Sequence, residues 1–132
     1  MSWTWRAGIW QAGTGRAGVT GRTLCRLQDI PDGASRGFGP ARGGFTGLFA
    51  VRRGDAVFVY VNACPHVGAA LDRAPDRFLT ADGARIACGA HGALFRIEDG
   101  ICVGGPCVGA RLEAVPARIV DGAILVPADA GL

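Results

Sequence analysis

The residues best suited to chemistry lie in two short motifs. One motif reads Cys-Pro-His-Val-Gly at residues 64–68, and the other reads Cys-Gly-Ala-His-Gly at residues 88–92. The chain has only 2 histidines, and both fall in these motifs beside a cysteine. Thiolate and imidazole are the ligands of zinc, and also of an iron–sulfur centre in which two histidines replace two cysteines on one iron. The candidate ligands are Cys64, His66, Cys88 and His91.

Residue types alone leave both metals open, but the order of the ligands is informative. Zinc fingers commonly pair cysteine with cysteine and histidine with histidine, whereas each motif here pairs one cysteine with one histidine. The alternative without a metal site is that the cysteines are small buried apolar residues and the histidines are loop residues. That alternative requires all four positions to coincide by accident.

The elements around the motifs are predicted to be short strands joined by tight turns. A strand is expected at residues 24–27, and each ligand motif follows an apolar strand and ends in glycine. No segment of ten or more residues shows helical periodicity, so the sequence predicts an antiparallel all-β domain. The expected hairpins, each with a Gly-Asp or Asp-Gly turn, join residues 45–51 to 56–61, 78–80 to 84–87, 93–97 to 101–103 and 118–120 to 123–126.

The two motifs resemble the ligand loops of Rieske proteins. Residues 64–71 are similar to the first loop, C-x-H-x-G-x-x-L, and residues 88–95 to the second, C-x-x-H-G-x-x-F. Residues 104–106, Gly-Gly-Pro, lie where such domains have a proline-containing loop that covers the cluster. Residues 118–126 resemble the closing hairpin of these domains, so the resemblance spans residues 24–127.

This resemblance implies an all-β, Rieske-like antiparallel β-sandwich with a cluster-binding subdomain formed by two loops. It also implies one [2Fe–2S] cluster per chain, with Cys64 and Cys88 on the inner iron and His66 and His91 on the outer iron near the surface. The stretch between the motifs is longer than in most Rieske proteins. We interpret the excess as a loop insertion within residues 72–83.

The implied function is that of a one-electron carrier, either a Rieske ferredoxin or a small electron-transfer subunit of an oxygenase or reductase system. Its partner would be a redox protein, either a reductase or the catalytic component. The alternative is a cluster-less or zinc-bound Rieske-fold interaction subunit of a larger enzyme. A catalytic oxygenase would need a second iron held by two histidines and a carboxylate, and both histidines are already assigned. We therefore expect a non-catalytic component.

The resemblance also predicts a low reduction potential. High-potential Rieske proteins of the cytochrome bc type join their ligand loops by a disulfide, and the matching positions here are Ala69 and Ala90. The same proteins donate hydroxyl hydrogen bonds to cluster and ligand sulfurs from positions that here are Ala93 and Phe95. Without those donors the extra negative charge of the reduced cluster is less stabilised.

Docking of the partner is expected at the cluster tip, on residues 67–70 and 92–94, which are small and apolar. Aspartate placed at Ala69 or Ala93 should then slow electron transfer and spare the cluster.

Composition sets the remaining expectations. Residues 23–128 are expected to form the Rieske domain, and residues 1–22, which hold all 3 tryptophans, an extension that is loosely ordered or docks a partner. The net charge of +3, without a basic run, argues against nucleic-acid binding. No apolar stretch is long enough for a membrane span and no signal segment is evident, so a cytoplasmic protein is expected.

The cysteines outside the motifs are expected to be thiols rather than a disulfide framework. Cys25 should pack in the core. Cys102 and Cys107 flank the cover loop and are either small packing residues or a disulfide that closes the loop.

Overall fold

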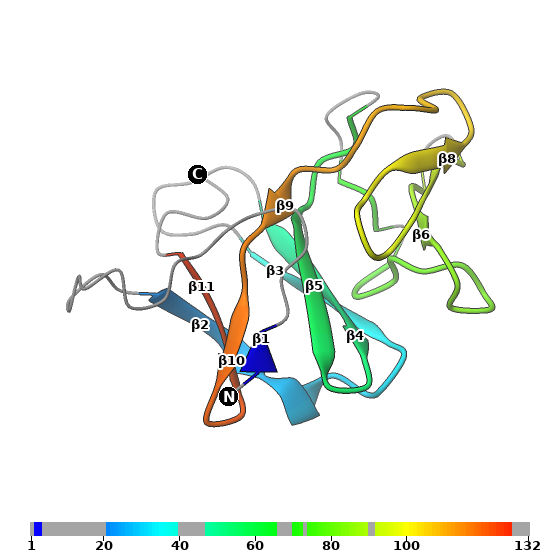
Figure 1. Ribbon diagram of the computed structural model, residues 1–132. Coiled ribbons are helices and arrows are strands. Elements are labelled where there is room, and N and C mark those ends of the chain that lie inside the picture. The colour runs from blue at the N-terminus through cyan, green and yellow to red at the C-terminus, as the bar shows by residue number, and fades with distance from the viewer. Residues whose placement is uncertain are drawn as a thin grey trace.

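Three antiparallel sheets make up the computed structural model, which describes residues 21–39, 47–65, 70–72, 74–89 and 92–127 and the backbone of residues 2–3 (Figure 1). Two four-stranded sheets have the orders β1-β10-β11-β2 and β3-β4-β5-β9, and a small third sheet has the order β6-β7-β8. The strands of the first sheet are β1 (Ser2–Trp3), β10 (Arg118–Val120), β11 (Ala123–Pro127) and β2 (Gly21–Arg26). Those of the second are β3 (Ser35–Phe38), β4 (Leu48–Arg53), β5 (Ala56–Val61) and β9 (Ala114–Val115). Those of the third are β6 (Ile86–Ala87), β7 (Leu94–Phe95) and β8 (Cys102–Gly104).

The second sheet is the middle layer, because its two long strands are buried on both faces. Every residue of 48–51 and of 57–61 is buried, and alternate side chains point to opposite sides. One face packs on the first sheet and encloses what we call the base core. The other face packs on the third sheet and encloses the tip core. The base core contains Ile30, Leu48, Ala50, Val57, Val59, Val61, Val115, Ala117, Ile119, Ile124 and Val126. The tip core contains Phe49, Val51, Phe58, Tyr60, Cys64, Leu71, Phe78, Ile86, Cys88, Ala93, Phe95, Ile97, Cys102 and Leu112.

The all-β expectation is confirmed, and the described residues include only one short helical turn, the 3₁₀ turn η1 (Leu27–Asp29). The hairpins β4–β5 and β10–β11 form as predicted, and the turn of the latter places Asp121 and Gly122 at φ values of 51° and 80°. The expected strand at residues 24–27 instead covers 21–26, since Leu27 already belongs to the turn.

The two remaining hairpins are shorter than predicted. Residues 78–80 join the next strand through a single bridge, Leu79 to Ile86. Strands β7 and β8 pair at Phe95–Cys102 and Leu94–Gly104, with a register shift between the two pairs. Short ladders are enough here because most of these strand residues are anchored by the tip core.

Strand β3 was not predicted from the sequence. Its residues, Ser-Arg-Gly-Phe, have weak strand propensity, yet all four pair with β4. Gly37 packs closely here, since a Cβ at this position would lie 3.1 Å from the Phe78 ring, a tighter contact than is usual. Tertiary contact therefore decides this strand.

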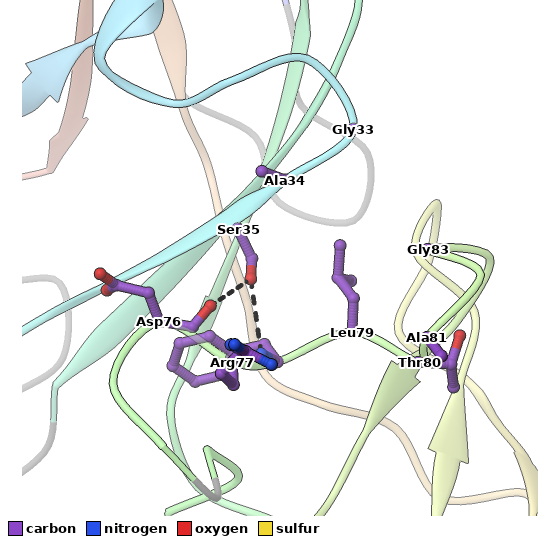
Figure 2. A pocket seen from close by; sticks show the side chains of 10 residues that line it. Gly33, Ala34, Ser35, Asp76, Arg77, Leu79, Thr80, Ala81 and Gly83 are labelled. Atoms are coloured by element: carbon purple, nitrogen blue, oxygen red, sulfur yellow. Dashed lines mark hydrogen bonds between the residues drawn. The ribbon is translucent and has the colours of Figure 1, made fainter.

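The inserted segment at residues 72–83 folds back onto β3. The Ser35 hydroxyl donates to the backbone oxygen of Asp76 at 2.8 Å (Figure 2). The Asp76 carboxylate also accepts from the Gly37 N–H at 2.8 Å. Phe78 is fully buried and stacks on Phe49 with ring centroids 4.4 Å apart. The interpretation as a surface loop insertion was therefore incomplete, because the segment also supplies part of the tip core.

Figure 2 shows a surface hollow between this segment and the start of β3, lined by Ser35, Asp76, Arg77 and Thr80 among others. Among the described residues that line it, neither Cys64 nor Cys88 is found.

The first described residues of the chain extend the first sheet, since Ser2 pairs with Ile119 and Trp3 with Arg118. The expectation of a loosely ordered or docking extension falls mainly on residues 4–20, which lie outside the described residues. In the ranges described, no helix has the length and apolar character needed to cross a membrane.

Candidate metal centre

The first ligand motif follows the end of β5, where Cys64 turns into the tip core and is 1% exposed. Asn62 closes the loop that follows. Its side-chain oxygen accepts from the Leu71 N–H at 2.8 Å, and its side-chain nitrogen donates to Asp72 at 3.2 Å. One amide side chain thus brings the two ends of the first ligand loop together.

The second ligand motif begins directly after β6, and Cys88 is 2% exposed. The Cys88 N–H donates to the Ala93 carbonyl at 2.9 Å, and the Gly92 N–H donates to the Cys88 carbonyl at 3.1 Å. Gly92 has a φ of 74°, a conformation that glycine adopts without a Cβ penalty. These bonds make a tight loop whose cysteine faces inward.

A direct backbone bond ties the two loops together, from the Gly89 N–H to the Leu71 carbonyl at 2.9 Å. Both cysteines belong to the tip core, so two thiols from separate strand ends share one apolar environment. Soft thiolate ligands held together in this way suit the all-sulfur iron of a [2Fe–2S] cluster.

His66 and His91 lie outside the described residues, and so do Ala69 and Ala90. Within the described ranges alone, no group of three or more histidine, cysteine or acidic side chains is placed to hold a metal ion. The histidine half of the ligand set therefore rests on the sequence motif.

The predicted cover loop lies against the second ligand loop. Gly105 has a φ of 87°, and a Cβ at this position would come within 2.7 Å of the Ala93 Cα. Only glycine lets the two backbones approach so closely. The loop is anchored further by the Cys102 N–H, which donates to the Ala110 carbonyl at 2.8 Å.

Cys107 also joins the cover loop to the tip core. Its thiol donates to the Cys102 sulfur at 3.2 Å, and the side chain packs against the tip core that contains Cys64. Burial, together with the neighbouring Cys102 and Cys64, raises the pKa of the Cys107 thiol to about 12. The sequence had no signal for this packing, because Cys107 is far from Cys64 along the chain.

All five cysteines are free thiols. The predicted alternative of a Cys102–Cys107 disulfide is therefore not found, and both residues pack beside the ligand cysteines. Cys25 packs at the edge of the base core, as expected. Burial raises the pKa of the Cys25 thiol, and the positive charge of Arg36 opposes that shift.

The expectation that Ala93 is a docking residue was wrong. Ala93 is 0% exposed and lies beneath Gly105, so aspartate there would bury a carboxylate instead of probing a surface. The large apolar side chains that are exposed in the described part of the chain are Val103, at 44%, and Val108, at 66%. Both flank the cover loop, which places an apolar surface beside the ligand loops.

The two positions expected to lack hydroxyl donors are both in the tip core. Ala93 and Phe95 are each 0% exposed. The surroundings of the ligand cysteines at these positions are thus apolar.

A comparison with protein families identifies the family to which the two ligand loops and the surrounding sheets belong. The family model of the Rieske [2Fe–2S] domain matches residues 22–119. The search of curated proteins found no match.

Among solved structures, the chain is similar to the ferredoxin of carbazole 1,9a-dioxygenase from Nocardioides aromaticivorans IC177. The identity is 27%, the TM-score is 0.66, and the match covers 82% of this chain and 97% of that one. It is also similar to the Sphingomonas yanoikuyae B1 ferredoxin, with 25% identity, a TM-score of 0.62, and coverage of 81% and 97%.

A third similar chain comes from a complex of reduced oxygenase and oxidized ferredoxin in carbazole 1,9a-dioxygenase. Its identity is 24%, its TM-score is 0.67, and the coverage is 86% of this chain and 98% of that one. At this identity the likeness supports the fold.

Proposed function

Since this chain belongs to the Rieske [2Fe–2S] family and carries single electrons on one [2Fe–2S] cluster, we propose that Cys64, His66, Cys88 and His91 hold that cluster. The observation that carries the assignment is the convergence of the two buried thiols in the tip core, on loops tied by the Gly89–Leu71 bond. Both histidines occupy the ligand positions of the same two motifs.

The cluster supplies the chemistry by accepting and releasing one electron at a time. Cys64 and Cys88 provide the soft, anionic inner ligands, and the tip core excludes water from them. His66 and His91 would hold the outer iron. The Leu71–Asn62 and Gly89–Leu71 bonds keep the ends of the two loops together, which would limit reorganisation during electron transfer.

The partner that we propose is the oxygenase component of a Rieske oxygenase system, with a reductase as electron donor. The similarity to the ferredoxin of a carbazole dioxygenase, over 97% of that ferredoxin, supports this choice. A ferredoxin chain from an oxygenase–ferredoxin complex has the same fold. The exposed Val103 and Val108, which flank the cover loop, would form part of the surface that docks this partner.

We further propose that residues 23–128 form the Rieske domain, that residues 1–22 are an extension of it, and that the protein is cytoplasmic. Five free thiols fit a reducing compartment. Fractionation of the source cells with an antibody would test the location.

Ligand replacement tests the site. Cys64→Ser and Cys88→Ser should each abolish the visible absorption of the cluster and reduce iron and sulfide to background, because the inner iron requires thiolate. Cys25→Ser is the matched control, since this cysteine is also partly buried but packs on the base core. A Cys64→Ser protein with native iron content and a native spectrum would contradict the ligand assignment.

A further inference from the structure

The backbone on both sides of Cys88 is bonded to the same preceding segment of the chain. The Ala87 N–H donates to the Phe78 carbonyl at 2.8 Å, and the Gly89 N–H donates to the Leu71 carbonyl at 2.9 Å. Leu71 and Phe78 are fully buried and belong to the tip core. The position of the segment that joins them therefore decides where the backbone around Cys88 lies.

Asp76 fastens this segment to the edge of the central sheet. Its carboxylate accepts from the Gly37 N–H of β3 at 2.8 Å. Its backbone oxygen accepts from the Ser35 hydroxyl at 2.8 Å (Figure 2). The Ser35 oxygen in turn accepts from the Phe78 N–H at 3.4 Å. One aspartate thus joins the base of the molecule to the segment that holds Cys88.

The backbone conformation of Asp76 has a counterpart elsewhere in the fold. Asp76 has a φ of 63°, a left-handed conformation that aspartate, asparagine and glycine adopt more readily than other residues. Asp121, in the β10–β11 turn, is also an aspartate at positive φ, with a value of 51°. The two residues have the same charge and a similar backbone, but only Asp76 lies on the segment bonded to the neighbours of Cys88.

We propose that Asp76 is a positioning residue for Cys88, and that its bond to the edge of β3 determines how firmly the protein retains its cluster. This inference rests on the proposed ligand role of Cys88. Asp76 acts through the backbone of the inserted segment.

The physical reason is the weakness of the third sheet. Strands β6 and β7 have two residues each, so their ladder holds the second ligand loop by few bonds. Release of the cluster requires this loop to open locally, and local opening is easiest where few bonds must break. A hydrogen bond to an ionised carboxylate is stronger than one between neutral groups. The Asp76 bond therefore makes opening of the loop more costly.

Loss of visible absorption from the holoprotein after addition of a chelator tests the proposal. Asp76→Gly removes the carboxylate but tolerates the positive φ. This variant should release the cluster about threefold to tenfold faster than wild type, the effect of one net hydrogen bond. Asp121→Gly is the matched control, because it makes the same substitution at the same kind of backbone position and should release the cluster at the wild-type rate. Equal rates in the two glycine variants would overturn the proposal.

Rescue by asparagine identifies the hydrogen bond as the cause. Asp76→Asn keeps a side-chain oxygen for the Gly37 N–H and tolerates the same φ. Its release rate should therefore lie closer to that of wild type than to that of Asp76→Gly. An asparagine variant that releases the cluster as fast as the glycine variant would contradict the proposed role of the bond.

Two further measurements on the holoprotein separate positioning from general destabilisation. The electron paramagnetic resonance lines of the reduced cluster should broaden in Asp76→Gly, since Cys88 would then occupy more than one position. Hydrogen exchange read by mass spectrometry should show faster exchange at residues 86–89 and unchanged exchange at residues 48–51. An equal loss of protection in both regions would show that Asp76 only stabilises the domain as a whole.

Ser35→Ala provides a second route that keeps Asp76 itself. It removes the hydroxyl bond to the Asp76 backbone oxygen and leaves the carboxylate bond to Gly37 in place. Release of the cluster should be faster than in wild type, by a smaller factor than in Asp76→Gly. A wild-type rate in Ser35→Ala would count against the segment as the support of Cys88, even if Asp76→Gly failed to fold.

The failure of this inference is distinguishable from that of the proposed function. If Cys88→Ser keeps a native cluster, the ligand assignment itself is wrong. If Cys88→Ser loses the cluster while Asp76→Gly and Asp121→Gly behave alike, only the role of Asp76 is refuted.

Discussion

The central sheet and the small third sheet are built by different means. Strands β4 and β5 pair over six positions each and are buried on both faces, so their register is held by hydrophobic burial. Strands β6 and β7 have two residues each, and β8 has three. The tip instead depends on single bonds, such as those from Leu71 to Asn62 and from Gly89 to Leu71. We therefore expect the base to be stable by itself, and we expect the two ligand loops to gain stability from the metal that joins them.

Removal of the cluster should therefore have the largest effect on local stability, and it should affect the tip and the base differently. After chelation, amide hydrogens of residues 86–95 should exchange faster by at least about tenfold, equivalent to about 1.4 kcal/mol. Amides of residues 48–51 and 57–61 should keep their protection, because these strands pair along their whole length and alternate side chains pack in the base core, which does not include the ligands. Hydrogen exchange read by mass spectrometry measures both regions in one experiment. Uniform loss of protection would show that the base depends on the metal too.

The reduction potential of the cluster depends on how many hydrogen-bond donors the tip offers to the ligand sulfurs. Ala93 and Phe95 are buried in the tip core and provide no hydroxyl donor. We expect a midpoint toward the low end of the Rieske range, about −150 mV rather than about +300 mV. Voltammetry near neutral pH checks this value. A midpoint above about +100 mV would mean that backbone amides supply what the missing hydroxyls do not.

Two glycine-to-alanine substitutions distinguish the effect of close packing in the cover loop from the effect of backbone strain. Gly105→Ala places a Cβ against Ala93, whereas Gly109→Ala, at a φ of 93°, meets no atom within 4 Å. Both variants carry the strain of a positive φ, about 1–2 kcal/mol. Gly105→Ala should lose roughly 1–3 kcal/mol more, from overpacking, and should release its cluster sooner. Thermal unfolding and the decay of visible absorption measure the two effects. Equal behaviour of both variants would show that the cover loop does not rest on the second ligand loop.

Substitution of an exposed valine at the expected docking surface should have the smallest effect on the protein itself. Val108→Asp should slow electron transfer to the oxygenase by up to about tenfold, since a carboxylate would have to be desolvated in the contact. The cluster spectrum should stay unchanged, because Val108 is 66% exposed and its replacement leaves the tip core intact. Gln28→Asp, exposed on the base, is the control for added negative charge. Stopped-flow kinetics with reduced protein compares the variants, and equal rates would place the partner on another face.

The sequence by itself determined the local features of this protein. The ligand motifs, the turns at Gly54 and Gly122, and the all-β class all depend on neighbours a few residues apart. The apolar runs at residues 48–51 and 57–61 also marked strands, although only the structure showed that both faces of each are buried.

Tertiary structure decided the features that depend on residues distant in the chain. Strand β3 forms because β4 and the inserted segment cover it, not because Ser-Arg-Gly-Phe favours strands. Ala93 is part of a small apolar loop in the sequence, yet Gly105 covers it and removes it from the surface. Cys107 packs on the tip core that contains Cys64 only because the cover loop folds over that core, where Gly105 lies against Ala93. Such contacts arise from packing between segments that local propensity does not relate to each other.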